Sequence, residues 1–245
     1  MSGTKSAWNE WAIEADGLSK AFGNNLALNS IDLRVGKGEH LVVFGPNGAG
    51  KTTLVKILAT LSRPSSGRVC LNGTDIRSAP TSIRRQVGLV SHQTFLYDDL
   101  TVYENLKFYG RMYDVPDLEQ RIREVVSWVR LEPHLYQRVG TLSHGMQRRL
   151  SIARAVIHNP SIVFLDEPEV GLDPHAVTML RDVLDSVNIP ERTIVITTHN
   201  LKQGLEMGDR VIILNKGRIV YQALRDELDA TNIHRVYEYY TGIGE

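Results

Sequence analysis

Short apolar runs alternate with longer amphipathic stretches along this chain. The short runs are mostly four or five residues long and rich in β-branched side chains, as buried β-strands are. Helix-length stretches separate them, which favours a mainly parallel sheet covered by helices on both faces. The pattern predicts strands at Ile31–Val35, His40–Phe44, Val69–Leu71, Val87–Val90, Ile162–Leu165, Thr193–Thr197 and Val211–Leu214, and helices at Lys51–Leu61, Thr101–Tyr113, Leu118–Val129, Met146–His158 and His175–Val187.

Residues 94–142 depart from this alternation. Helical patterns follow one another there without a convincing strand, and Pro116 and Pro133 interrupt them. This predicts a helical subdomain inserted into an α/β body. We expect one domain over residues 1–245, with a catalytic core at 1–93 and 143–230, the helical subdomain at about 94–142, and a C-terminal helix or tail at 231–245.

Antiparallel pairing is expected near both ends of the chain. The runs Trp11–Leu18 and Ile31–Val35 are predicted to pair antiparallel. Val211–Leu214 and Gly217–Tyr221 are joined by a short turn and predict a hairpin. The segment Ile233–Tyr240 is apolar on one side, so we expect it to pack on the body or on a partner.

The composition excludes several classes of protein. Hydrophobic residues make up 42% and charged residues 23% of the 245 residues, which argues against disordered, collagen-like and coiled-coil chains. Lys and Arg number 28, as do Asp and Glu, so there is no reason to expect broad nucleic-acid binding. The single Cys70 fits a reducing compartment. Without a bilayer-length apolar run or a signal sequence in Met1–Glu10, we expect a soluble cytoplasmic chain.

A phosphate-binding motif lies between a predicted strand and a predicted helix. Residues Gly45–Thr52 satisfy the pattern G-x-x-x-x-G-K-[ST]. Glycines let backbone N–H groups approach phosphate oxygens, and the start of a helix adds positive potential. We expect Lys51 to reach the β- and γ-phosphates and the Thr52 hydroxyl to ligate Mg²⁺. The alternative, a glycine-rich turn with an exposed lysine, is disfavoured by the flanking strand and helix. The candidate nucleotide-binding residues here are Asn47, Gly48, Gly50, Lys51, Thr52 and Thr53.

Two acidic residues end another predicted buried strand. Asp166 and Glu167 directly follow the apolar run Ile162–Leu165, and buried carboxylates are costly unless they meet a cation or a proton. Asp166 is positioned to hold Mg²⁺ through water, and Glu167 to polarise the water that attacks the γ-phosphate. The alternative is a strand that runs into a solvated acidic loop.

A third motif gives the chain a family resemblance. Residues Leu142–Gln147 read Leu-Ser-His-Gly-Met-Gln and precede a predicted helix. With the two motifs above, they make the chain resemble the nucleotide-binding subunit of an ATP-binding cassette (ABC) transporter over nearly its whole length. The usual signature of that family is Leu-Ser-Gly-Gly-Gln, so His144 and Met146 are departures. Ser143 and Gly145 are retained, and in the family they face phosphate from a helix N-terminus, where Ser143 is also an ordinary N-cap.

The resemblance implies roles for further residues. Gln93 matches a glutamine that senses Mg²⁺, the attacking water and the membrane partner. Asp173 resembles the residue that links the two sites of a dimer. His199 matches the histidine that contacts the γ-phosphate, although a lone histidine at a strand end is more often structural. Phe22 corresponds to the aromatic residue that stacks on adenine, with a core phenylalanine as the alternative.

The resemblance also implies a fold and an assembly. The fold is α/β: a P-loop NTPase with a RecA-like parallel-sheet core, an N-terminal antiparallel β subdomain and an inserted α-helical subdomain. In the family each ATP lies between the phosphate loop of one chain and the signature of another, and this chain has one of each, at Lys51 and Ser143. We therefore expect a homodimer that hydrolyses ATP with Mg²⁺. It would lie on the inner face of the cell membrane, held by polytopic membrane subunits, without contacting cargo or nucleic acid.

Several functions compete within this superfamily. Residues 58–67 and 91–109 resemble the haem-exporter subunit of bacterial cytochrome c maturation, and a drug or lipid exporter is the alternative. DNA-maintenance ATPases carry a long coiled coil between the two motifs, whereas Ser143 follows Lys51 by 92 residues without sustained heptads. Ribosome-associated relatives carry two cassettes in one chain. A small-molecule kinase or a GTPase would not explain Ser143, Asp173 and His199.

Overall fold

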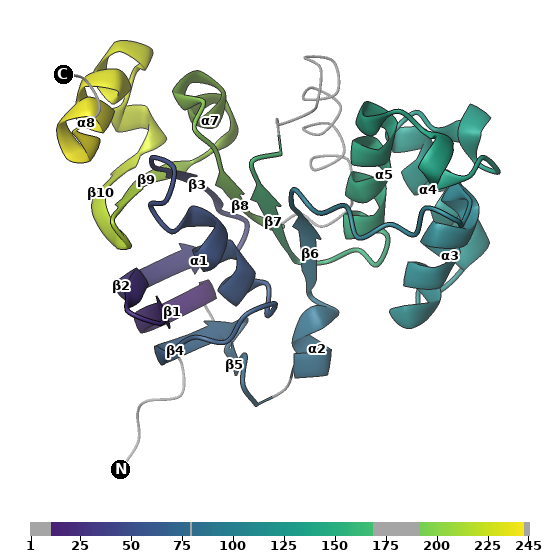
Figure 1. Cartoon of the computed structure of the whole chain (residues 1–245), viewed down its shortest axis with the longest axis horizontal. Coiled ribbons are helices and arrows are strands. Elements are labelled where there is room, and N and C mark those ends of the chain that lie inside the picture. The colour runs from purple at the N-terminus through teal and green to yellow at the C-terminus, as the bar shows by residue number, and fades with distance from the viewer. Residues whose placement is uncertain (1–10, 79, 169–191, 243–245) are drawn as a thin grey trace.

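The computed structural model describes residues 11–78, 80–168 and 192–242, whose strands form two sheets (Figure 1). The strands are β1 (Trp11–Phe22), β2 (Asn25–Gly36), β3 (His40–Phe44), β4 (Ser66–Leu71), β5 (Thr74–Asp75), β6 (Val87–Val90), β7 (Ile162–Asp166), β8 (Thr193–Thr197), β9 (Arg210–Asn215) and β10 (Arg218–Leu224). The α-helices are α1 (Lys51–Leu58), α2 (Pro80–Arg84), α3 (Val102–Met112), α4 (Leu118–Trp128), α5 (His144–Val156), α7 (Leu201–Met207) and α8 (Ala230–Thr241).

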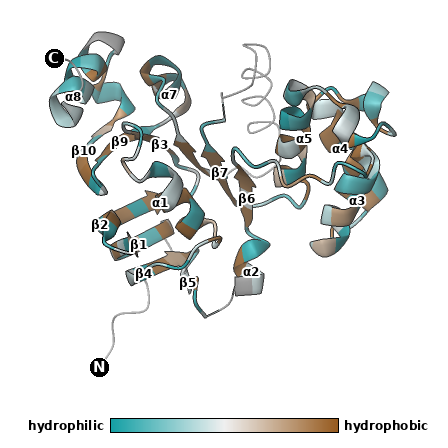
Figure 2. Ribbon diagram, viewed as in Figure 1, coloured by the Kyte–Doolittle hydropathy of each residue, from teal (hydrophilic) through white to brown (hydrophobic). Residues whose placement is uncertain are grey.

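The central sheet has six strands in the order β10-β9-β3-β8-β7-β6. Strands β9, β3, β8, β7 and β6 run parallel to their neighbours, and β10 pairs antiparallel with β9, so the predicted parallel core and C-terminal hairpin are confirmed. Ile162 and Phe164 of β7 pack into one core cluster, and Val163 and Leu165 into the other. Both faces are therefore buried, which explains why the middle positions of these strands are largely hydrophobic (Figure 2).

The second sheet is antiparallel, in the order β2-β1-β4-β5. The predicted pairing of the two N-terminal strands is confirmed, but β2 begins at Asn25 rather than Ile31. Among residues 25–30 only Leu28 is fully buried, and the polar Asn29 and Ser30 separate it from the alternating run that begins at Ile31, so the sequence pattern does not extend the strand to Asn25. Helix α1 shares a core cluster with both sheets through Leu54 and Ile57, which fixes the phosphate loop between them.

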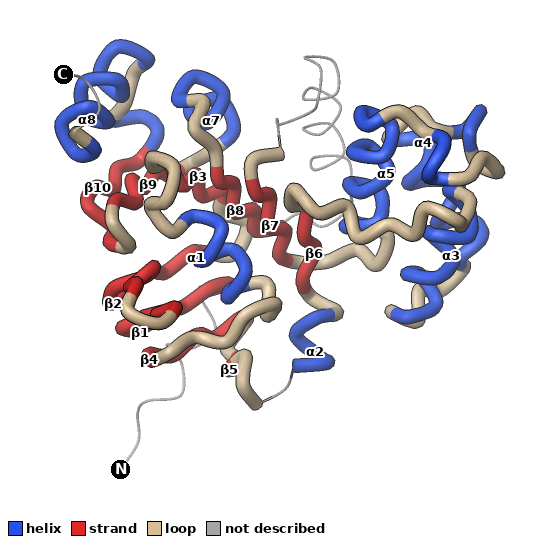
Figure 3. Tube along the Cα trace, in the orientation of Figure 1, coloured by secondary structure: helices blue, strands red, loops and turns tan. Residues whose placement is uncertain are grey.

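Helices α3, α4 and α5 lie together beyond β6, at one end of the molecule (Figure 3). Residues 94–142 hold α3 and α4 and none of the named strands. Thr101 starts α3 through a capping box with Glu104. Two predicted helices differ from the structure by two or more residues at an end: α1 ends at Leu58 rather than Leu61, because Thr60 turns to φ 61°, and α5 runs from His144 to Val156 rather than from Met146 to His158. The predicted helix His175–Val187 lies outside the described residues.

Helix α8 packs on the body of the chain, which settles one of the two expectations for this segment. It contacts α7 and β9, and Ile233 is fully buried there. Asn215 Nδ2 donates to the carbonyl oxygen of Tyr240 at 2.8 Å. None of the helices in the described ranges combines the length and apolar character that crossing a bilayer requires.

Candidate functional site

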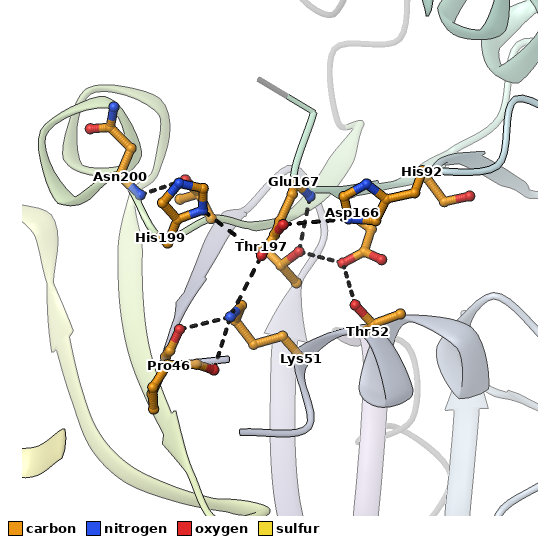
Figure 4. Close-up of polar contacts among 12 residues, drawn as sticks. Pro46, Lys51, Thr52, His92, Asp166, Glu167, Thr197, His199 and Asn200 are labelled. Carbon is orange, nitrogen blue, oxygen red and sulfur yellow. Dashed lines mark hydrogen bonds and ion pairs between the residues drawn. The ribbon is translucent and has the colours of Figure 1, made fainter. Parts of the chain in front are cut away.

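The phosphate loop connects β3 to α1 at the carboxyl edge of the central sheet. Gly50 precedes the helix at φ 107°, where a Cβ atom would lie 2.5 Å from the Ala27 carbonyl oxygen, so only glycine fits without a shift. Lys51 is 5% exposed, and its Nζ donates to the carbonyl oxygens of Gly45 at 2.7 Å and Pro46 at 3.2 Å (Figure 4). The alternative of an exposed lysine on a glycine-rich turn is therefore excluded.

Asp166 lies at the end of β7, beside the start of α1. It is 1% exposed, and its Oδ1 accepts from Thr52 Oγ1 at 3.2 Å and from Thr197 Oγ1 at 2.7 Å. Because Asp166 is buried and hydrogen-bonded, the alternative of a strand that runs into a solvated acidic loop is excluded. A hydroxyl and a carboxylate oxygen converge here, and Mg²⁺ prefers such oxygen ligands with few protein groups, so the residues fit that ion. In the described ranges, no three His, Cys, Asp or Glu side chains gather into a metal site, so any Mg²⁺ here would be held by few protein groups.

Glu167 has a left-handed backbone, with φ 48°. Its N–H donates to the carbonyl oxygen and to Oγ1 of Thr197, at 3.0 and 3.1 Å. Three nitrogen atoms surround its carboxylate: Lys51 Nζ at 3.7 Å, His92 Nε2 at 3.4 Å and His199 Nδ1 at 3.9 Å (Figure 4). The backbone strain is typical of functional sites, where surrounding contacts hold a residue in an uncommon conformation.

A groove of about 650 Å³ opens over the phosphate loop. Phe22 lines it and is 56% exposed, so it is not a core phenylalanine. Lys20 Nζ lies 4.9 Å from the centre of the Phe22 ring. The groove thus combines a flat aromatic surface with the phosphate loop. Its lining residues are Phe22, Asn25, Leu26, Ala27, Pro46, Asn47, Gly48, Ala49, Gly50, Lys51, Thr52, Thr53, His92, Glu167 and Lys216.

The signature residues lie away from this groove. Ser143 is the exposed N-cap of α5, and its Oγ accepts from the Met146 N–H at 3.3 Å. Gly145 follows in the first turn, and neither residue lines the groove. Helix α5 stands beyond β6 and β7 from α1 (Figure 1). Within the described part of one chain, the phosphate loop and the signature are therefore not brought together.

Two other predicted residues, Gln93 and Asp173, are not seen in contact with the Glu167 carboxylate in the described part of the chain. Gln93 is exposed and does not line the groove, although its carbonyl oxygen accepts from Ser91 Oγ at 3.0 Å. Asp173 lies outside the described residues.

Sequence reasoning missed two residues that contact Asp166 or Glu167, namely His92 and Thr197. His92 precedes Gln93, and no spacing rule links it to Glu167. Thr197 closes an apolar strand, where a threonine is ordinary. The adjacency of parallel strands β7 and β8 is the one signal that could have predicted Thr197 beside Asp166.

Comparison with known proteins agrees with this geometry. The model of the ABC transporter family matches residues 28–170. The chain is 36% identical to the daunorubicin resistance ATP-binding protein DrrA3 of Streptomyces coeruleorubidus, over 89% of this chain and 70% of that protein. It is also 36% identical to the Nod factor export ATP-binding protein I of Rhizobium sp. strain N33, over 84% of this chain and 69% of that one. A solved dimeric ATP-binding cassette, in a post-hydrolysis state with ADP and Pi, superposes with a TM-score of 0.78 at 26% identity, covering 87% of this chain and 98% of that one.

Proposed function

This chain belongs to the ABC transporter family and is an ATPase, and on that premise we propose that it is the motor subunit of a membrane exporter. The observation that carries the proposal is the position of Glu167. Its carboxylate lies beside Lys51 of the phosphate loop and follows directly after the buried Asp166. A carboxylate at that point can orient a water toward a phosphate that Lys51 holds.

We propose these roles for the other side chains. Backbone N–H groups from Asn47 to Thr53 and the Lys51 ammonium bind the phosphates, and Phe22 stacks on the base. Thr52, Asp166 and Gln93 would hold Mg²⁺, and the ion would supply positive charge that neutralises the phosphate oxygens. Glu167 takes a proton from the attacking water, and His199, close to the same carboxylate, donates a hydrogen bond to the γ-phosphate.

The second half of the site comes from another copy of the chain. Ser143 and Gly145 are accessible at the start of α5, where N–H groups and the helix dipole favour an anion. One chain has a single phosphate loop and a single signature, so a two-fold dimer gives two complete sites. The similar cassette of known structure is a dimer, which supports this arrangement. From the family resemblance, we propose that Asp173 links the two sites of this dimer.

The membrane partner is a polytopic subunit on the inner face of the cell membrane. Export rather than import is supported by the relative whose name states Nod factor export. Two cargo classes follow from different observations. The relative for daunorubicin resistance favours an amphipathic organic compound, whereas the haem hypothesis rests on residues 58–67 and 91–109. The cassette contacts neither cargo nor nucleic acid, so the membrane subunit selects the cargo.

Co-purification tests the transporter assignment. The tagged chain, isolated from its native membranes, is expected to bring down a polytopic membrane protein, and adding ATP to vesicles holding both is expected to move cargo. Haem and an anthracycline, offered separately, distinguish the two cargo classes. Recovery with DNA or ribosomes and no membrane protein would overturn the assignment.

Glu167→Gln tests the role of the carboxylate. The amide keeps the shape but cannot take a proton, so turnover is expected to fall by about 100-fold or more while ATP still binds. Calorimetric ATP titration and phosphate release measure the two effects. Normal turnover in this variant would show that another group activates the water.

A further inference from the structure

Arg148 connects helix α5 to the ends of two neighbouring strands. It lies in the second turn of α5 and is 6% exposed. Its Nη1 donates to the carbonyl oxygen of Ser91, directly after β6, and its Nη2 to the carbonyl oxygen of Glu167, directly after β7, at 3.1 Å. One guanidinium therefore bridges the two loops whose side chains meet at the candidate site.

Each of these hydrogen bonds fixes a peptide group that orients a site residue. The Glu167 N–H is held by Thr197, and Arg148 holds its carbonyl, so both ends of the strained left-handed residue are restrained. The Ser91 carbonyl belongs to the peptide group that leads into His92. His92 Nε2 in turn lies 3.4 Å from Glu167 Oε2. Arg148 thus sets the main chain on both sides of the His92–Glu167 contact.

A guanidinium is suited to this task because of its geometry. Its donors lie in one rigid plane, so two carbonyl groups that it binds are held in a fixed relation, which a single ammonium centre cannot reproduce. Hydrogen bonds from a charged donor are also about twice as strong as neutral ones. Burying a cation is costly, and Arg148 is only 6% exposed. Its burial therefore indicates that the two carbonyl hydrogen bonds, which an apolar side chain could not make, are needed at this position.

We propose that Arg148 is a positioning residue for ATP hydrolysis: it holds Glu167 and the Ser91–Gln93 segment in the arrangement that aims the Glu167 carboxylate at the attacking water. This inference rests on the proposed role of Glu167. Because α5 begins at Ser143, the same side chain also ties the start of the signature helix to the end of β7.

Arg148→Met removes both donors and keeps an unbranched side chain. We expect kcat to fall about 10- to 100-fold, with the KM for ATP changing less than about threefold, because the two carbonyl groups that Arg148 binds, of Ser91 and Glu167, lie outside the phosphate loop. Arg148→Lys, which can reach one carbonyl, is expected to recover part of the loss. Arg149→Met is the matched control. Arg149 also donates to two carbonyls, of Val129 and Arg130, but these lie at the end of α4, so its kcat is expected to stay within about twofold of wild type.

A double-mutant cycle with Glu167→Gln decides whether Arg148 acts through Glu167. Single-turnover rates of the wild type, Arg148→Met, Glu167→Gln and the double variant are compared, with circular dichroism and ATP binding confirming the fold of each. If Arg148 acts through Glu167, Arg148→Met adds no further loss in the Glu167→Gln background. Fully additive losses, an equal loss in Arg149→Met, or an unchanged kcat in Arg148→Met overturn the inference. If Glu167→Gln alone keeps full activity, the proposed role of Glu167 in hydrolysis is wrong. The single variant in the cycle distinguishes that outcome from a failure of the inference about Arg148.

Discussion

The residues around Glu167 come from three separate segments of the chain. Lys51 belongs to the phosphate loop, His92 follows β6, Thr197 ends β8 and His199 lies two residues further. The sequence predicted Lys51, Asp166 and Glu167, because each belongs to a short motif that directly follows a buried strand. His92 and Arg148 could not be predicted, since no local spacing encodes the contact of His92 with Glu167 or the two carbonyl contacts of Arg148.

Lys51→Ala tests the phosphate loop at the scale of one side chain. The buried ammonium is expected to bind phosphate through charge-assisted hydrogen bonds, so its loss should weaken ATP binding about 10- to 100-fold. Isothermal titration with ATP measures the effect. Lys56→Ala is the control, because Lys56 lies on the same helix but is exposed. Equal affinities for the two variants would contradict the role of Lys51.

His158 predicts a pH dependence of stability. Its ring stacks 3.9 Å from Tyr113, and Nε2 lies 3.1 Å from the Val87 carbonyl oxygen, so the neutral ring donates from Nε2. Burial, followed by the nearby charges of Arg154, Arg121 and Arg192, lowers the pKa of His158 from 6.5 to about 4. Between these values the unfolded chain takes up a proton that the folded chain does not. The free energy of unfolding should therefore fall by about 2 kcal/mol from pH 7 to pH 5 through this residue.

Urea unfolding of His158→Phe checks this pH dependence. The phenyl ring retains the stack on Tyr113 and cannot titrate, so the variant should lose distinctly less stability than the wild type between pH 7 and pH 5. Identical losses in the two proteins would mean that His158 is not neutral in the fold.

At the scale of elements, the strands buried in the central sheet were predicted most closely. Strands β3, β6 and β8 begin and end as their apolar runs do, because both faces of the central sheet are buried. The half-exposed start of β2 carries no such signal, and the end of α1 depends on the left-handed turn at Thr60. The predicted boundaries were therefore wrong where an element is partly exposed, as at the start of β2, or where backbone conformation ends it, as at the end of α1.

The start of α1 depends on a glycine. In Gly50→Ala the new Cβ would lie 2.5 Å from the Ala27 carbonyl oxygen and 2.9 Å from Leu28 Cδ2, at a φ of 107°. Strain and crowding together should lower the free energy of unfolding by about 3 kcal/mol. Gly48→Ala is the control, since Gly48 also has positive φ but nothing within 4 Å of its Cβ position, and about 1 kcal/mol is expected. Urea unfolding without nucleotide measures both; equal losses would exclude the close contact as the cause.

At the scale of the molecule, the predicted fold of an ABC ATPase is confirmed, with a parallel core and a separate antiparallel sheet. Within one chain, however, the phosphate loop and the signature do not meet. The groove over Lys51 contains no signature residue, and Ser143 caps an exposed helix start elsewhere. In the proposed dimer, a single copy would supply two half-sites, and ATP would complete each one by bringing a second copy against it.

The mass of Glu167→Gln in solution, by sedimentation with and without ATP and Mg²⁺, tests this most directly. ATP is expected to raise the mass from 27.5 kDa to about twice that value, and Ser143→Arg in the same background is expected to prevent the rise because it fills the signature with a bulky side chain. A Glu167→Gln protein that binds ATP to saturation yet remains at the mass of one chain would contradict a site shared between two copies.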